Sequence, residues 1–398
     1  SHNREFNMRI LAISLILLGS SSLYSSDISI SERVGSRDFP SVFQAWNPLD
    51  MAEQYPLDTL EGRLAAGAKH DLGWEEPISQ ISFNTPLVLG VVWDGPHGGE
   101  SLAFTAETLA HALDYRRKLL EKNPSMVFLM EIRWRDAPGS HLPEDSDWWL
   151  RNEDGSRAEG WTGGPEPYYM LNYENPGFQD QVAKQARVAV DSGVYDGVML
   201  DWSGHIDVVR KVREALGEEP IIIVNIHADI EDGEKYKDYI NGSFMECDPD
   251  QVRKKQGLCT WKNMAAAVEF FETELRSPQI NALEVWGLRD NLASMRAATT
   301  LALTHSDAYV LFADPNNLPT PDHLHDWYDF WDVDLGKPSS EKEQMKSGAF
   351  RRRFDNGVVV YNPEGNGPVK VNFKKDRIRV SDGRKGRKFD LNEVDGDI

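Results

Sequence analysis

An aspartate and a tryptophan directly follow an apolar run in the segment Tyr195-Asp-Gly-Val-Met-Leu-Asp-Trp202. The run reads as a short buried strand, and packing does not explain an acid at its carboxyl end. In a (β/α)8 barrel, reactive side chains lie at the carboxyl ends of the strands. Asp201 is therefore a candidate catalytic carboxylate, with Trp202 as an aromatic surface beside it. Asp196, before the run, is assigned to a turn because Asp-Gly is a common turn signal.

Other apolar runs along the chain also end in polar or aromatic residues. Glu246 ends the sixth run in the same way as Asp201 ends the fourth. Because residues two apart on a strand share a face, Met199 should face the inside of the barrel with Asp201, and Leu200 should face the helices. We expect the polar ring around the two acids to bind substrate. Its predicted members are Trp46, Asp94, Glu131, Arg133, Trp202, Asn225, His227, Glu284, Trp286 and Asp314.

Hydrolysis of a glycosidic bond is the chemistry that an acid-rich ring of this kind fits. It needs one acid to protonate the leaving oxygen and one carboxylate to attack the anomeric carbon or activate water. Asp201 is the predicted nucleophile or base and Glu246 the predicted acid, whose pKa neighbouring carboxylates and burial would raise. Tryptophans can stack on sugar rings. The sequence thus predicts a hydrolase acting on a poly- or oligosaccharide, without a cofactor or metal.

Two other function classes stay open. A catalytically silent carbohydrate-binding barrel would keep the tryptophans without needing two acids at catalytic separation. A metal-dependent hydrolase or lyase should carry a cluster of histidines and acids at the strand ends, where only His227 is found. His323 and His325 have a spacing that could bind a metal, but no third cluster supports it, so we expect a solvated loop there.

Eight apolar segments alternate with helical ones, which predicts a parallel sheet covered by helices. The predicted strands are residues 42–46, 87–94, 127–134, 195–202, 220–227, 242–248, 280–286 and 308–314. The predicted helices are residues 59–70, 105–122, 175–191, 205–216, 236–240, 261–276 and 292–304, of which the third starts at Asn175-Pro176. We therefore predict an α/β fold, a (β/α)8 TIM barrel over residues 38–338. An open doubly wound sheet is less favoured because the chain lacks a glycine-rich dinucleotide turn. Residues 347–398 should form a small antiparallel, β-sandwich-like domain, with the acidic last residues, 391–398, frayed.

Residues 1–26 resemble an upstream extension followed by a secretory signal peptide, with Met8-Arg9, an apolar run and a small-residue region. The apolar run is too short to span a membrane, so a secreted or periplasmic protein is expected. The formal net charge of -21 argues against nucleic acid as a partner. Cys247 and Cys259 could form a disulfide in an oxidising compartment.

Four segments of the chain resemble a known group of proteins. They are Tyr195-Asp-Gly-Val-Met-Leu-Asp-Trp202, Trp148-Trp-Leu-Arg-Asn-Glu-Asp-Gly155, Asn175-Pro-Gly-Phe-Gln-Asp180 and Arg353-Phe-Asp-Asn-Gly-Val-Val-Val-Tyr-Asn-Pro363. The chain resembles the hypothetical glycosyl hydrolase family 15 group, which is related in style to glycoside hydrolase family 114. The resemblance implies a (β/α)8 catalytic barrel with a C-terminal β-domain. In carrying acids on strands four and six, here Asp201 and Glu246, the chain is also similar to the retaining α-glycosidases of families 27, 31 and 36.

Overall fold

The computed structural model describes residues 28–46, 58–77, 89–164, 166–250, 257–315 and 323–398. The predicted signal peptide at residues 1–26 lies outside the described residues. No helix in the described part of the chain combines the length and apolar character that crossing a membrane requires.

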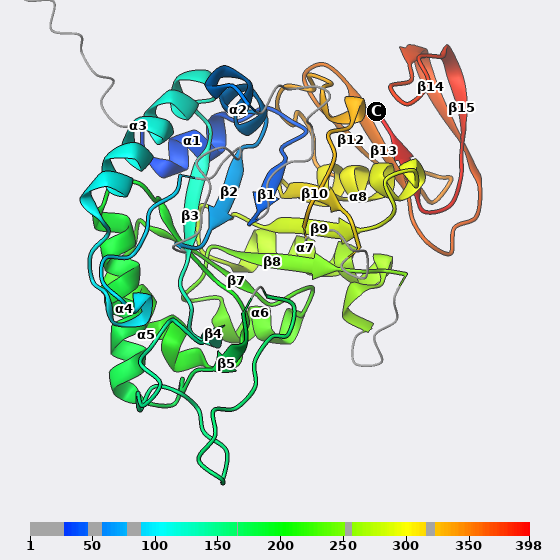
Figure 1. Ribbon diagram of the computed structural model, residues 1–398. Coiled ribbons are helices and arrows are strands. Elements are labelled where there is room, and N and C mark those ends of the chain that lie inside the picture. The colour runs from blue at the N-terminus through cyan, green and yellow to red at the C-terminus, as the bar shows by residue number, and fades with distance from the viewer. Residues whose placement is uncertain (1–27, 47–57, 78–88, 165, 251–256, 316–322) are drawn as a thin grey trace, which may run out of the picture.

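Eight parallel strands form one sheet in the order β1-β2-β3-β6-β7-β8-β9-β10. A parallel bridge between Val42 and Val310 joins the first strand to the last and closes the sheet into a barrel. Figure 1 shows the strands at the centre with helices around them. The predicted (β/α)8 barrel is therefore confirmed. The strands are β1 (Phe43–Ala45), β2 (Leu72–Glu75), β3 (Val127–Glu131), β6 (Gly197–Leu200), β7 (Ile221–Asn225), β8 (Gly242–Cys247), β9 (Ala282–Trp286) and β10 (Tyr309–Ala313).

The predicted second strand at residues 87–94 was wrong, because β2 (Leu72–Glu75) takes that place in the barrel. Residues 87 and 88 lie outside the described residues, and the rest of the run belongs to no strand of the sheet. The backbone N–H groups of Leu89 and Gly90 donate to the Glu75 carboxylate instead. The run is apolar because it is buried against the barrel, and burial alone does not distinguish a strand from an irregular covering segment.

The helices cover the outside of the barrel between successive strands, except the first helix, which precedes the first strand and packs against the core inside the barrel (Figure 1). They are α1 (Ile30–Ser36), α2 (Leu60–Gly67), α3 (Ala106–Lys122), α4 (Pro176–Asp191), α5 (Ile206–Leu216), α6 (Ile230–Tyr236), α7 (Trp261–Glu274) and α8 (Leu292–His305), with short 3-10 turns η1 (Gly98–Glu100), η2 (Gly257–Cys259) and η3 (Asp329–Trp331). Asn175 caps α4 as predicted, accepting hydrogen bonds from two backbone N–H groups. The helix expected at residues 236–240 lies earlier, because Asp229 caps its start.

Side chains alternate between two separate cores along each barrel strand, as the period of two requires. Met199 lies in the core inside the barrel with Phe43, Leu129 and Phe244. Leu200 lies in the larger core between the strands and the helices. This confirms the expected directions on β6, and it means that Asp201 follows the inward series. A hairpin of β4 (Asp136–Pro138) and β5 (Tyr168–Met170) lies within the long segment between β3 and α4.

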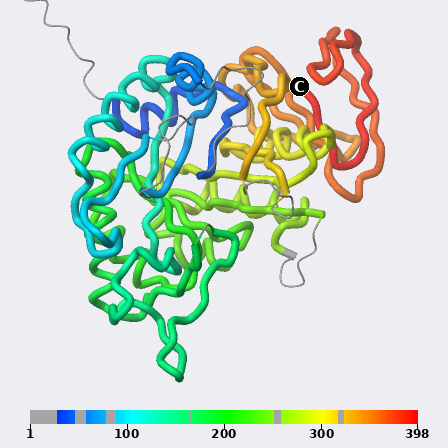
Figure 2. The backbone as a smooth tube through the Cα atoms, viewed as in Figure 1, coloured from blue at the N-terminus to red at the C-terminus, as the bar shows by residue number. Residues whose placement is uncertain are grey.

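Antiparallel sheets follow the barrel and lie beside α8. One sheet has the order β11-β12-β13-β16, and β14 pairs with β15 in a separate hairpin. The backbone trace places this hairpin at the edge of the molecule (Figure 2). The strands are β11 (Glu343–Gln344), β12 (Phe350–Arg353), β13 (Val358–Asn362), β14 (Val369–Ile378), β15 (Lys385–Leu391) and β16 (Asp395–Asp397).

The expectation that residues 391–398 fray was wrong, because β16 pairs with β13 and packs on α8. Asp395 is 3 % exposed and accepts two hydrogen bonds of 2.9 Å from Arg296 on α8. A Cβ atom at Gly396 would lie 1.8 Å from Thr300 Oγ1, so only glycine allows this approach. Asp395 is therefore an ion-pair partner of the barrel helix, and Asp397 pairs with Arg379, which follows β14.

Candidate active site

A cavity of about 500 Å³ lies where the barrel strands end. Residues that end or follow six barrel strands line it, together with residues of the loops. The lining consists of Trp46, Glu76, Glu131, Arg133, Arg135, Asp136, Trp161, Asp201, Trp202, Asn225, His227, Glu246 and His323. Carboxylates, arginines and indole rings thus converge at the end of the barrel where this fold carries its chemistry.

Asn225 joins the two predicted catalytic acids. Its side-chain nitrogen donates to Asp201 Oδ1 over 2.9 Å and to Glu246 Oε2 over 2.8 Å. Because both bonds start at one nitrogen, the two acceptor oxygens lie less than about 6 Å apart. Asp201 and Glu246 therefore face the same space, and the amide between them fixes their spacing.

Burial raises the pKa of Glu246, and the nearby carboxylates of Asp201 and Glu284 act in the same direction. The charges of His323 and His227 oppose this shift without cancelling it. His227 also orients the backbone, because its Nδ1 donates to the carbonyl oxygen of Glu246 over 2.8 Å. Glu246 is thus placed to hold a proton at a pH where an ordinary glutamate has lost it.

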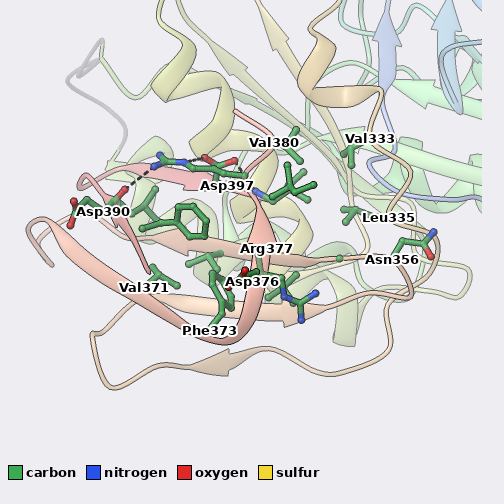
Figure 3. Close-up of a pocket in the computed structure, with 18 residues that line it drawn as sticks. Val333, Leu335, Asn356, Val371, Phe373, Asp376, Arg377, Val380, Asp390 and Asp397 are labelled. Atoms are coloured by element: carbon green, nitrogen blue, oxygen red, sulfur yellow. Dashed lines mark hydrogen bonds and ion pairs between the residues drawn. The ribbon is translucent and has the colours of Figure 1, made fainter. Parts of the chain in front are cut away.

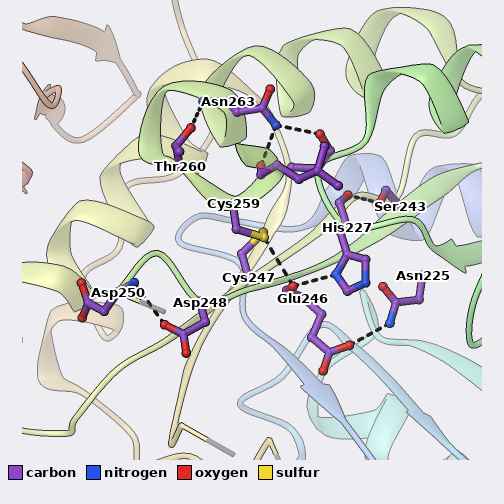
Figure 4. The surroundings of a disulfide bond; sticks show 12 residues. Asn225, His227, Ser243, Glu246, Cys247, Asp248, Asp250, Cys259, Thr260 and Asn263 are labelled. Atoms are coloured by element: carbon purple, nitrogen blue, oxygen red, sulfur yellow. Dashed lines mark hydrogen bonds between the residues drawn. A yellow bond between two sulfur atoms is a disulfide. The ribbon is translucent and has the colours of Figure 1, made fainter. Parts of the chain in front are cut away.

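The next residue after Glu246 forms a disulfide, Cys247–Cys259, with a Cα–Cα distance of 5.1 Å. The predicted possibility of this bond is confirmed. The bond ties the end of β8 to the turn that precedes α7. In Figure 4 the side chain of Glu246 extends away from the disulfide towards Asn225. The covalent link therefore restrains the backbone that carries a candidate catalytic acid.

Glu131 is the most deeply buried carboxylate in the cavity wall, with 2 % of its surface exposed. Burial raises its pKa to about 8, against the opposing charge of Arg133. The indole nitrogen of Trp46 donates to Glu131 Oε2 over 2.5 Å. Arg133 in turn pairs with Glu76 at 2.5 Å and lies 3.5 Å from Glu131. These four residues form one linked wall beside Asp201.

Backbone strain is concentrated at this cavity. Among the described residues, five other than glycine have a positive φ angle, and four of them line the cavity. Those four are Trp46 (51°), Trp202 (91°), His227 (52°) and His323 (65°). Large side chains rarely adopt this conformation, and residues held in it cluster at functional sites. The strained backbone places four aromatic side chains at the cavity. This supports a functional role for the cavity, and the support does not depend on the two acids.

The structure brings most of the predicted site residues together and leaves four out. Asp201 and Glu246 line the cavity together with Trp46, Glu131, Arg133, Trp202, Asn225 and His227. Asp94 does not, because it lies exposed on a turn after the run that was mistaken for a strand. Glu284 and Trp286 are buried and lie next to His323. The Nδ1 of His323 donates a hydrogen bond of 2.8 Å to Glu284. Asp314 is buried and pairs with Arg289 over 2.9 Å.

Five residues line the cavity without having been assigned to it from the sequence. They are Glu76, Arg135, Asp136, Trp161 and His323. Glu76 follows β2, so an acid after a short apolar run is the signal for it, but residues 87–94 form a longer apolar run and draw the prediction of the second strand away from it. His323 was expected in a solvated loop and is instead 6 % exposed. Trp161 comes from the long segment after β3, where an exposed tryptophan carries no periodic signal.

The histidines near the eighth strand are also buried. His325 is fully buried and its Nε2 lies 2.9 Å from Nε2 of His70. Burial lowers the pKa of His70 to about 4, so the pair shares one hydrogen between neutral rings at neutral pH. In the described part of the chain no three histidines, cysteines or acids are grouped as a metal would require.

A second cavity, of about 450 Å³, lies under the hairpin β14–β15. Figure 3 shows Val371, Phe373 and Val380 on its walls, with charged residues at its edge. Its largely apolar lining offers no pair of carboxylates arranged like Asp201 and Glu246. The catalytic candidates therefore lie in the barrel cavity.

The chain is a (β/α)8 barrel protein with C-terminal antiparallel sheets, an architecture shared with solved α-amylases. A maltogenic α-amylase from Thermotoga neapolitana matches at a TM-score of 0.53 and 12% identity, over 90% of this chain and 97% of that one. An α-amylase from Lactobacillus plantarum matches at 0.52 and 12% identity, over 92% and 98%. One from Malbranchea cinnamomea matches at 0.52 and 13% identity, over 93% and 97%. No protein-family model matches the sequence, and no curated protein matches it. The similarity establishes the fold, and the resemblance to hypothetical glycosyl hydrolase family 15 stays a prediction.

Proposed function

We propose that this protein is a secreted glycoside hydrolase that retains anomeric configuration, with Asp201 as nucleophile and Glu246 as acid and base. The observation that carries the proposal is the shared hydrogen-bond donor Asn225, which holds Asp201 Oδ1 and Glu246 Oε2 less than about 6 Å apart and so favours a short separation of the two carboxyl groups. Retaining enzymes separate their carboxyl groups by about 5 to 5.5 Å, whereas inverting enzymes need about 6.5 to 9.5 Å to admit a water molecule.

The environments of the two acids support these roles. Glu246, with its raised pKa, protonates the glycosidic oxygen while the Asp201 carboxylate attacks the anomeric carbon, forming an ester with the sugar. Glu246 then takes a proton from water, which attacks the same carbon and releases Asp201. The indole rings of Trp46, Trp161 and Trp202 provide apolar surfaces for the sugar rings.

The test compares reducing-sugar release from a panel of polysaccharides by the wild type, Asp201→Asn and Glu246→Gln. Each variant should lose roughly a thousandfold in kcat, because a catalytic group is removed. Asp94→Asn is the matched control, since Asp94 is exposed outside the cavity, and its activity should be unchanged. NMR of the first product should show the anomeric configuration of the substrate. Full activity in both acid variants would overturn the assignment, and an inverted first product would overturn the retaining mechanism.

A further inference from the structure

Two arginines on the same wall of the cavity differ in their partners. Arg133 lies within 4 Å of three carboxylates, at 2.5 Å from Glu76, 3.5 Å from Glu131 and 3.7 Å from Asp136. Arg135 has no ion pair with any described residue, although it lines the same cavity. Its buried Nε has no hydrogen-bond partner in the described structure. No hydrogen bond or ion pair joins the guanidinium of Arg135 to a described residue, so its outward-facing donors are available to a ligand in the cavity.

The position of Arg135 relates it to the reacting sugar. Its guanidinium carbon lies 4.9 Å from the ring centroid of Trp202, the residue after Asp201. Stacking on the indole fixes the plane of the guanidinium. A planar, oriented guanidinium with free donors recognises a carboxylate through two parallel hydrogen bonds.

We infer that the substrate is an acidic polysaccharide, and that Arg135 binds the carboxylate of a uronic acid residue next to the cleavage site. This inference rests on the proposed hydrolase function and adds the class of sugar to it. It also names Arg135 as a residue that determines specificity.

The charge balance inside the cavity permits an anionic sugar despite the number of acids in its wall. Arg133 offsets part of the negative charge of Glu76 and Asp136, at 2.5 and 3.7 Å from it. Burial raises the pKa values of Glu131 and Glu246, so both hold protons more readily than ordinary glutamates do. Arg135 is then the cation in the cavity wall that is available to bind the carboxylate of a sugar.

A second observation points to the same class of substrate. The hairpin segment 369–391 contains nine lysines and arginines and three aspartates, in a chain whose formal net charge is -21. Four of these cations pair with nearby aspartates. Five others have no ion pair with a described residue, and all five are exposed. These are Lys374, Lys375, Arg377, Lys385 and Lys388.

The exposed cations of the hairpin offer a long polyanion an electrostatic contact in addition to the cavity. The acidic barrel repels such a polymer, but at physiological ionic strength charges further than about 8 Å from it are largely screened. A local cluster of unpaired cations therefore attracts the chain in spite of the overall charge. A short acidic oligosaccharide that fills only the cavity should not need the hairpin.

The first experiment measures binding in the Asp201→Asn protein, which keeps the shape of the site without turnover. Calorimetry compares oligogalacturonate with its carboxyl-reduced, neutral form. We expect a preference for the acidic form that falls at least about tenfold when Arg135→Gln is added, since a hydrogen bond between charged groups is lost. Arg187→Gln is the matched control, because Arg187 pairs with Asp191 on the surface of α4, and it should leave the preference unchanged.

The second experiment tests the hairpin with polygalacturonate and with a short oligomer. Replacing Lys374, Lys375, Lys385 and Lys388 by glutamine should weaken binding of the polymer about tenfold and leave the oligomer unaffected. Equal weakening of both would overturn the role of the hairpin, as would binding to anionic phosphatidylglycerol vesicles in place of the polymer.

The outcomes separate this inference from the proposed function. Hydrolysis of neutral glycans without a preference for acidic ones would leave the hydrolase standing and overturn the inference. Binding of oligogalacturonate that depends on Arg135, without hydrolysis of any polysaccharide by the wild type, would overturn the hydrolase and leave acidic-sugar recognition in place. Loss of preference in the Arg187→Gln control would show that Arg135 has no specific role.

Discussion

Asn225 donates to both candidate catalytic acids, so it fixes their separation. A hydrogen bond to a charged acceptor contributes about 1.5 to 3 kcal/mol. The bond to Glu246 favours the charged form of that carboxyl group and so works against the burial that raises its pKa. No strand-end pattern in the sequence reveals this role, because it depends on three strands meeting at one nitrogen.

Replacing Asn225 by alanine should lower kcat by about 10- to 100-fold. Glu246 loses a donor that favours its charged form, so its pKa should rise further and the pH optimum should move upward. The pH dependence of kcat for the wild type, Asn225→Ala and the Asp94→Asn control measures both effects. An unchanged pH profile would show that the amide does not control the protonation of the pair.

Glu75 offers a test of buried charge outside the cavity. It accepts hydrogen bonds from Tyr195 and from the backbone of Leu89, and burial raises its pKa from 4.5 to about 7. The folded protein keeps a proton that the unfolded chain loses between pH 4.5 and 7. The free energy of unfolding therefore falls as the pH rises through this window, and above it the loss stays at its full value without further change with pH.

Glu75→Gln removes this titration and keeps an acceptor oxygen for the same donors. Its stability relative to the wild type should rise by up to about 3 kcal/mol between pH 4.5 and 7. Buried histidines also titrate near this range, but they are the same in both proteins and cancel in the difference. Urea unfolding at several pH values measures the difference, and parallel curves would contradict the prediction.

At the scale of elements, the disulfide restrains the end of β8. Cys247 and Cys259 are 12 positions apart, and closing a loop of this size stabilises the folded state by about 3 kcal/mol. The Cys247→Ser/Cys259→Ser variant should lose about this much stability. Its kcat should also fall about tenfold, because small displacements of a catalytic acid are costly.

Reduction of the wild type by dithiothreitol serves as the comparison for that variant. It should reproduce the loss of kcat, and the variant should not respond to dithiothreitol. A reduced wild type with full activity would show that Glu246 is held by its hydrogen bonds alone, such as that of His227 to its carbonyl oxygen.

The sequence was sufficient to predict seven of the eight barrel strands, because their largely apolar runs alternate with helical segments. The second failed because β2 is only four residues long and contains a glycine, whereas residues 87–94 are more apolar. Hydrophobicity indicates which residues are buried. Which strands pair with one another depends on the rest of the fold. The helix predicted at residues 236–240 starts earlier in the structure, because the side chain of Asp229 caps the first turn of α6.

Prediction of the site was limited in the same physical way. Alternation along strands located Asp201, Glu246 and Asn225, because the direction of a side chain follows from its position. It could not locate His323 or Trp161, which reach the cavity from loops. It also could not reveal positive φ angles at tryptophan and histidine, since these are imposed by the surrounding structure.

At the scale of the whole molecule, the two ends of the barrel have separate tasks. Asp196 at the start of β6 is buried and accepts hydrogen bonds from Arg33 on α1, Arg116 on α3 and the backbone of Phe128. Burial would raise its pKa, but the two guanidinium groups hold the pKa below its usual value. The expected turn residue is thus the centre of an ion-pair network that fastens two helices to the barrel.

Asp196→Asn should lower the free energy of unfolding by about 3 to 5 kcal/mol, because two buried arginines lose their counter-charge. Five residues of extended chain, about 16 Å, separate it from Asp201, so kcat of the folded protein should stay unchanged. Chemical denaturation and kinetics at low temperature measure the two effects. A loss of kcat without a loss of stability would place Asp196 in the catalytic machinery.

The contact between β16 and α8 bears on the order in which the protein is made. Arg296 and Asp395 are 99 positions apart, and Gly396 fits directly against Thr300. During synthesis, α8 emerges from the ribosome long before the strand that covers its outer face. The barrel therefore spends that interval with an uncovered helix, and a nascent chain stalled between residues 315 and 394 should bind chaperones that recognise exposed apolar surface.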